Sequence, residues 1–202
     1  MAGIVDLDGV AAGFADSVPE AQAVFRGVLD AMARPGRVVD LGDVPVPPEP
    51  LIPGAAAICL ALVDFETALW LDGTASASAA AVSHLRFHCG CPIAATPDEA
   101  RFAIVADAAS MPALASFDLG SDGYPDLSTT VIVQVDALDE GRGRRLSGPG
   151  IDGHARLKVT GLPDRFWHEL RLNNACFPRG VDVILCAGTR VAALPRTTLV
   201  ED

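Results

Sequence analysis

Apolar positions at helical spacing define the first clear element of the chain. Ser17, Val18, Pro19 and Glu20 form a capping box with proline in the first turn, the usual start of a helix. The positions that continue it at helical spacing are Ala21, Phe25, Val28, Leu29 and Met32. Pro35 and Gly36 end the pattern, so the sequence predicts a helix from residue 17 to about residue 33.

Beyond this helix, short apolar runs alternate with helical patterns. Strands are predicted at residues 38–41, 67–71, 102–106, 129–135, 181–185 and 191–194, and a strand pair at 145–147 and 154–159. Helices are predicted at residues 55–63, at 76–82 with an end near Ser83-His84, at 112–117 and at 163–176. A proline-rich loop separates residues 41 and 55. The alternation without an internal repeat predicts an α/β fold with a mixed sheet covered on both faces.

Composition limits the classes of partner. The chain has 202 residues, which favours one domain over its whole length, with residues 1–13 as a flexible N-terminal segment. Its formal net charge of −11 argues against binding to nucleic acid or to an anionic membrane surface. The clearest apolar run, residues 55–63, is too short to span a bilayer. The acidic start and five irregularly spaced cysteines predict free thiols in a reducing cytoplasm.

Three arginines occupy similar places at the ends of predicted elements. Arg34 precedes Pro35-Gly36, Arg179 lies between Pro178 and Gly180, and Arg196 follows a proline. Guanidinium groups bind phosphate or phosphonate oxygens in a bidentate manner, and irregular backbone at element ends commonly forms ligand sites. Each arginine could equally pair with an acid, of which Asp182 is close to Arg179 in sequence, or cap a helix. The sequence leaves both interpretations open.

The segment from residue 84 to residue 91 contains possible metal ligands. His84, His88, Cys89 and Cys91 have the pattern H-x3-H-C-x-C, but Cys-x-Cys is tighter than the usual Cys-x2–4-Cys spacing of zinc sites. Residues 86–89 are expected to leave the helix. We therefore favour structural thiols, with His88 in a polar crevice, over a metal site. Gly148-Pro149-Gly150 fits neither phosphate-binding glycine motif and predicts a turn.

Several segments, in this order, resemble the PhnH family of the bacterial carbon–phosphorus lyase system. The matching segments are residues 25–36 (FRGVLDAMARPG), 85–88 (LRFH), 146–151 (LSGPGI), 177–182 (FPRGVD) and 194–198 (LPRTT). The resemblance extends from about Phe14 to Thr198, and its specificity comes from the order and spacing of the segments. With the residue types above, it gives a candidate substrate-binding set of Arg34, Arg86, His88, Arg179 and Arg196 for a phosphonate or nucleotide anion.

The resemblance carries further implications. It implies a three-layer α/β/α sandwich similar to pyridoxal-phosphate-dependent transferases but without their cofactor. It also implies a cytoplasmic subunit that joins PhnG, PhnI and PhnJ. Such a subunit is expected to form a homodimer when isolated and not to be catalytic alone. That system makes ribose 1-phosphonate 5-triphosphate from ATP and an alkylphosphonate.

Two other functions remain as alternatives. Pyridoxal phosphate is held by a lysine imine, and Lys158 is the single lysine of the chain. An independent transferase-like enzyme would have to use it, although Lys158 lies in a predicted strand where a solvated position is simpler. A metalloprotein using His84, His88 and the nearby thiols is the third hypothesis. The favoured hypothesis is a scaffold and binding subunit that needs no cofactor.

Overall fold

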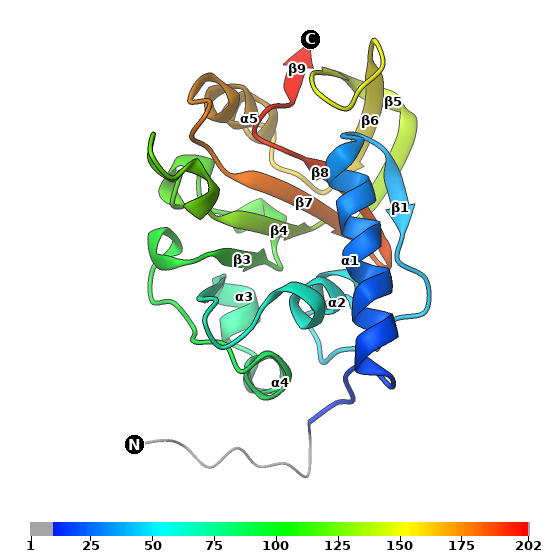
Figure 1. Cartoon of the computed structure of the whole chain (residues 1–202), viewed down its shortest axis with the longest axis vertical. Helices are drawn as coiled ribbons and strands as arrows, with labels where there is room; N and C mark the ends of the chain where they lie inside the picture. The colour runs from blue at the N-terminus through cyan, green and yellow to red at the C-terminus, as the bar shows by residue number, and fades with distance from the viewer. Residues whose placement is uncertain (1–9, 202) are drawn as a thin grey trace.

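A six-stranded mixed sheet forms the centre of the molecule. The computed structural model describes residues 10–201 (Figure 1). The strand order is β1-β8-β7-β4-β3-β2. Parallel pairing joins β2 (Leu69–Leu71), β3 (Phe102–Val105), β4 (Thr130–Gln134) and β7 (Asp182–Ala187). β8 (Arg190–Leu194) and β1 (Val38–Asp40) extend the sheet with antiparallel pairs. The prediction of an α/β fold with a mixed sheet is confirmed.

Both faces of this sheet are buried, as the apolar runs predicted. Ile104 lies beside Ile132, and Ile132 beside Ile184, so these side chains share one face and one core. Their chain neighbours point to the other face, where Val133 and Leu185 belong to a second core. Strands with two buried faces are continuously apolar rather than alternating.

Helices cover the first face. They are α1 (Ser17–Ala33), α2 (Pro53–Leu62), α3 (Gly73–Ser76) and α4 (Ala79–Cys89). α2 is the most buried of them, and its small residues Ala55, Ala56 and Ala57 are almost fully covered. In α1 the core side is formed by Val24, Val28 and Ala31. Phe25 and Leu29, which helped to define the predicted helix, are instead 48% and 55% exposed.

The second face differs from the three-layer α/β/α expectation. It is covered by one α-helix, α5 (Phe166–Ala175), by the segment from residue 108 to residue 117, and by a three-stranded antiparallel sheet of order β6-β5-β9. These strands are β5 (Ala137–Ser147), β6 (Ala155–Thr160) and β9 (Leu199–Glu201). Leu138, Leu146 and Leu157 turn inward from the small sheet and pack with Phe166 and Leu170 of α5. The predicted strand at residues 145–147 is therefore the end of a longer one.

Short 3-10 helices connect several strands. They are η2 (Pro97–Glu99), η3 (Ala108–Ser110), η4 (Leu114–Ser116) and η5 (Pro125–Leu127). η4 stands where a short helix was predicted at residues 112–117. Within residues 10–201, no helix has both the length and the apolar character needed to cross a membrane.

Candidate functional site

Four loops meet at the end of the sheet where β7 begins and β8 ends. They follow α1 (residues 34–37), join β5 to β6 (148–154), lead from α5 into β7 (176–181) and join β8 to β9 (195–198). Together with η5 they enclose a cavity of about 560 Å³, which we call the loop groove. Its lining residues are Met32, Ala33, Pro125, Asp126, Pro149, Gly150, Phe177, Pro178, Asp182, Pro195, Arg196 and Thr197.

The loop groove requires glycine at position 150. Gly150 has a φ of +83°, and a Cβ there would lie 2.1 Å from the carbonyl oxygen of Ala33. It would also approach Cδ of Pro35 to 3.1 Å. The turn between β5 and β6 therefore packs directly on the end of α1, and only a residue without a side chain permits this distance. This contact explains the glycine-rich turn without a phosphate cradle.

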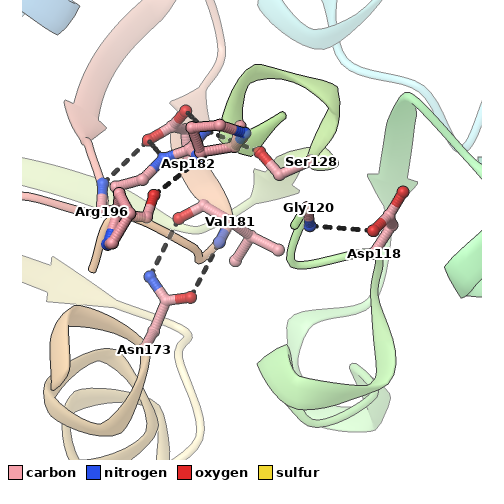
Figure 2. A network of polar contacts seen from close by, with 9 residues as sticks. Asp118, Gly120, Ser128, Asn173, Val181, Asp182 and Arg196 are labelled. Atoms are coloured by element: carbon pink, nitrogen blue, oxygen red, sulfur yellow. Dashed lines mark hydrogen bonds and ion pairs between the residues drawn. The ribbon is translucent and has the colours of Figure 1, made fainter. Parts of the chain in front are cut away.

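An ion pair between Arg196 and Asp182 forms the floor of the loop groove (Figure 2). The Arg196 Nη2 donates to Asp182 Oδ2 at 2.5 Å, and Nε and the backbone N–H of Arg196 donate to Oδ1 at 3.2 and 2.8 Å. The remaining guanidinium N–H groups reach Ser128 Oγ at 2.6 Å and the carbonyl oxygen of Pro125 at 2.5 Å. With side chains 13% and 16% exposed, Arg196 and Asp182 are largely buried. This arginine joins η5, β7 and the loop after β8.

Asn173 supports the same site from α5. Its side chain donates to the carbonyl oxygen of Val181 at 2.9 Å and accepts from the Val181 N–H at 2.8 Å (Figure 2). The next residue, Asn174, donates to the carbonyl oxygen of Arg196 at 2.9 Å. Two adjacent amides thus fix the backbone on both sides of the ion pair. Asn173, Ser128 and Asp182 were not predicted as site residues, although the Asn-Asn pair lies only two residues before the matching segment 177–182.

Arg34 and Arg179 lie at the same end of the molecule but are more exposed. Arg34 is paired with Asp30, one helical turn earlier, and its side chain is 53% exposed. Arg179 is 46% exposed, and its Nε lies 3.3 Å from Oδ1 of Asp122. The suggestion that Arg179 pairs with Asp182 is wrong, because Asp182 is engaged by Arg196. Exposed pairs of this kind are weak and can be exchanged for another anion.

Arg86 and His88 lie elsewhere, on α4. Figure 1 shows α4 at the far end of the molecule from β9 and the loops around it. The prediction that residues 86–89 leave the helix is wrong, because α4 continues to Cys89 and ends at Gly90 in a left-handed conformation. Ala81, Leu85 and Cys89 pack on the first core, and this packing extends the helix to its last residue. The five predicted site residues therefore divide between two places.

His84 and His88 face residues 10–13 rather than a metal site. His84 Nδ1 and His88 Nε2 both donate to the carbonyl oxygen of Ala11, at 3.2 and 2.9 Å, and their ring centroids are 4.6 Å apart. Residues 10–13 of the predicted flexible segment thus contact α4, while residues 1–9 are outside the described part of the chain. Burial, together with the nearby His88, lowers the pKa of His84.

The thiols behave as core groups. Four of the five free cysteines are buried, and Cys176 is half-buried. Burial raises the pKa of the Cys59 and Cys186 thiols. Across the described residues, no group of three or more His, Cys, Asp and Glu side chains is arranged to hold a metal ion.

Polar groups at the opposite ends of the strands form hydrogen bonds within the chain. α/β proteins commonly bind ligands there, at the carboxyl ends of parallel strands. Asp72, after β2, accepts from the N–H groups of Ala75 and Asp107 at 2.8 and 2.9 Å. Gln134, at the end of β4, accepts from Ile52 at 2.8 Å and donates to Pro50 at 2.9 Å. The loop groove, which the matching segments form, lies at the amino ends of these strands.

Comparison with known proteins agrees with the resemblance found in the sequence. The family model described as "Bacterial phosphonate metabolism protein (PhnH)" matches residues 12–201. The chain is 43% identical over 188 residues to the "Alpha-D-ribose 1-methylphosphonate 5-triphosphate synthase subunit PhnH" of Rhizobium meliloti (strain 1021), covering 93% of this chain and 94% of that protein. It is 35% identical over 184 residues to the "Putative C-P lyase subunit protein HtxG" of Stutzerimonas stutzeri, covering 89% and 85%. All segments that carried the resemblance lie within residues 12–201, which the family model matches.

Proposed function

This chain belongs to the PhnH family, and from that premise we propose that it is a subunit of the carbon–phosphorus lyase core complex. In this function it supports the formation of ribose 1-phosphonate 5-triphosphate from ATP and an alkylphosphonate. The observation that carries the proposal is the 43% identity to a curated PhnH subunit over 93% of the chain. Its place is cytoplasmic, where ATP is available.

The outer face of α1 supports an assembly function. Val18, Phe25 and Leu29 are 64%, 48% and 55% exposed and recur at positions i, i+7 and i+11, so they form one stripe along the helix. Met32 continues the stripe into the loop groove, whose rim carries Phe177, 60% exposed. Large apolar side chains gathered on a surface typically mark an interface. We assign this stripe to contact with a partner subunit of the PhnG, PhnI or PhnJ type, and to self-association as a homodimer when the partners are absent.

The arginines of the loop groove have different parts in this proposal. Arg34 and Arg179 are exposed and weakly paired, and are therefore the groups that can contact a phosphonate or nucleotide anion. Arg196 is saturated by internal acceptors and positions the loops from which the others project. Arg86, exposed on α4, and His88 form a separate candidate contact.

In this proposal the chain is not catalytic by itself. Its fold descends from a transferase-like ancestor that used pyridoxal phosphate. Lys158, which an aldehyde cofactor would require, is exposed on β6 as its strand position predicted. An internal aldimine absorbs visible or near-ultraviolet light and can be fixed by borohydride. A purified protein with such absorbance, fixed at Lys158, would instead support the rival function of an independent enzyme.

Co-purification tests the assembly function. Tagged chain is co-expressed with PhnG, PhnI and PhnJ from the same genome, and we expect all three to be captured in stable proportion. Capture of none of them, in a host that carries the whole pathway, would contradict the proposal.

A matched pair of variants tests the surface. Phe25→Ser should weaken capture of the partners, because it removes an aromatic side chain from the α1 stripe. Phe65→Ser, which changes an aromatic residue 73% exposed in the loop after α2, serves as the control and should leave capture unchanged. Equal capture by both variants would refute the assignment of the stripe while leaving the assembly function intact.

A further inference from the structure

Positive charge is concentrated in one part of this acidic chain. Residues 141–158 contain Arg142, Arg144, Arg145, Arg156 and Lys158 but only one acid, Asp152, whereas the whole chain has 15 basic and 26 acidic residues. These residues form the hairpin of β5 and β6 in the small sheet. A local reversal of charge against a net charge of −11 is the arrangement that binding of a strong anion requires.

The hairpin encloses a cavity of about 380 Å³, which we call the cationic recess. Four of its lining residues are cations, namely Arg144, Arg145, Arg156 and Lys158, and none is a carboxylate. The recess beside Arg34 is different, because Glu140 and Asp152 both line it. Glu140 accepts a hydrogen bond from the backbone of Val38 and is thereby directed toward β1. Glu140 and Asp152 thus belong to the recess beside Arg34 and not to the cationic recess.

A bulge in β5 builds this geometry. Glu140 and Arg144 both pair with Leu157, so the three residues between them are extra to the ladder. Gly143 has a φ of +77°, and a Cβ there would lie 2.6 Å from both the Leu157 oxygen and the Lys158 Cα. Arg156 donates from Nη1 to the carbonyl oxygen of Gly143 at 3.1 Å. The bulge therefore presses closely on β6 and holds Arg156 in place.

Like charges face each other across this hairpin. Arg145 lies directly opposite Arg156, an arrangement that destabilises an antiparallel pair unless another charge compensates it. Arg145 is compensated by Glu201, with Nε and Oε2 2.9 Å apart. Lys158 lies opposite Asp139 in the ladder. Arg144 and Arg156 have no ion pair with an acid among the residues that the structure describes, so an anion in the recess would supply the missing charge.

Trp167 completes one wall of the cationic recess. It is half-buried at the start of α5, with its ring 5.3 Å from that of Phe166 in an edge-to-face contact. The recess thus combines several charge-assisted donors with one flat aromatic surface, and its volume is that of a site for a small organic phosphate.

We propose that the cationic recess binds the polyphosphate group of a nucleoside or sugar triphosphate. The choice of a triphosphate rests on the proposed function, in which ATP is consumed and a ribose triphosphate is formed. Arg144, Arg156 and Lys158 contact the phosphate oxygens, and Trp167 lies against the organic part. This site is distinct from the loop groove and uses the residue, Lys158, that the rival cofactor hypothesis assigned to an imine.

Calorimetric titration of the purified chain with inorganic triphosphate and with ATP tests the site. We expect both to bind. Because contacts between basic side chains and phosphate weaken as salt rises, the affinity should fall steeply over a roughly tenfold increase in salt, from about 50 to about 500 mM. Stronger binding of ATP than of inorganic triphosphate would be the contribution of Trp167, and should disappear in Trp167→Leu.

Charge-matched variants locate the binding. Arg144→Gln and Lys158→Gln should each weaken triphosphate binding about tenfold, since each removes a charge-assisted contact. Arg190→Gln removes the same charge from an exposed position on β8 and should bind as the parent does. Equal affinity in all three variants, or no binding by the parent chain, would overturn the proposal. Circular dichroism melting checks that the variants are folded, and all three positions are exposed.

Co-purification separates this inference from the proposed function. Arg144→Gln and Lys158→Gln should still capture the partner subunits while losing triphosphate. If instead these variants lose the partners and the parent does not bind triphosphate, the hairpin is a docking surface for an acidic protein and the triphosphate site is refuted. If the parent binds triphosphate but captures no partner, the site survives and the assembly function fails.

Discussion

Replacing Arg196 with alanine should lower the free energy of unfolding of the protein, and not only remove a contact to a ligand. The Arg196 guanidinium bonds to Asp182, Ser128 and Pro125, which belong to two other segments of the chain. Its removal leaves the largely buried Asp182 carboxylate without a counter-charge. Breaking one side of a buried ion pair costs about 3–5 kcal/mol, and we take about 3 kcal/mol because the pair keeps some exposure.

This free energy corresponds to a large change in melting temperature. For a chain of this size, 1 kcal/mol shifts Tm by about 2–4 °C, so Arg196→Ala should lower Tm by about 6–12 °C. Arg179→Ala provides the internal control, because its partner Asp122 is 87% exposed. An exposed pair contributes about 0–1 kcal/mol, so that variant should lose at most about 4 °C.

Urea unfolding followed by circular dichroism measures both variants, and a double-mutant cycle with Asp182→Ala isolates the pair. The double variant should be less destabilised than the sum of the single variants by at least about 1 kcal/mol. The reasoning is refuted if Arg196→Ala keeps the parent stability but fails to support growth on a phosphonate. Arg196 would then be a ligand-binding residue, as its sequence position also allowed.

Three further predictions concern other parts of the chain. The pKa of His84 is lowered below its ordinary value of 6.5. The contribution of the neutral His84 to the free energy of unfolding should therefore be fully present above pH 6.5 and be lost as pH decreases below it. Urea midpoints at pH 8 and pH 5.5 should show this loss in the parent and in His168→Gln but not in His84→Gln; an unchanged loss in His84→Gln contradicts it. With a thiol reagent and mass spectrometry, Cys176 should be labelled before the four buried thiols, and early labelling of any buried thiol would be contrary to the structure. Gly150→Ala should cost about 2–4 kcal/mol through its contact with α1, against about 1 kcal/mol for Gly153→Ala in open space; equal losses of Tm would exclude that contact.

The sequence predicted the central sheet because its strands are buried on both faces. Runs such as residues 129–135 and 181–185 are apolar at successive positions, and each became a parallel strand of the mixed sheet. The small second sheet was not foreseen as a layer. β9 has only three residues, too few to show a period, and β5 is interrupted by the bulge before Arg144. Charged, exposed strands of this kind carry little apolar pattern.

The site could be predicted only in part, because it depends on distances that sequence neighbours do not reveal. Asp182 is three residues from Arg179 but pairs with Arg196, fourteen residues away, since β7 and β8 are antiparallel and Val183 lies opposite Leu194. The three loop arginines were identified by their neighbouring prolines and glycines, yet their grouping required the tertiary fold. In α1, two adjacent stripes are apolar, and only packing showed that Phe25 belongs to the exposed one.

Reconstitution of the triphosphate-forming reaction tests most directly whether this chain works only within an assembly. Purified chain, purified PhnG–PhnI–PhnJ and the mixture of both are each supplied with ATP and methylphosphonate, and released adenine is quantified by chromatography. We predict no adenine from the chain alone and more adenine from the mixture than from the partners without it. Steady release of adenine by the chain alone, or no gain when it is added to the three proposed partners, would contradict the account.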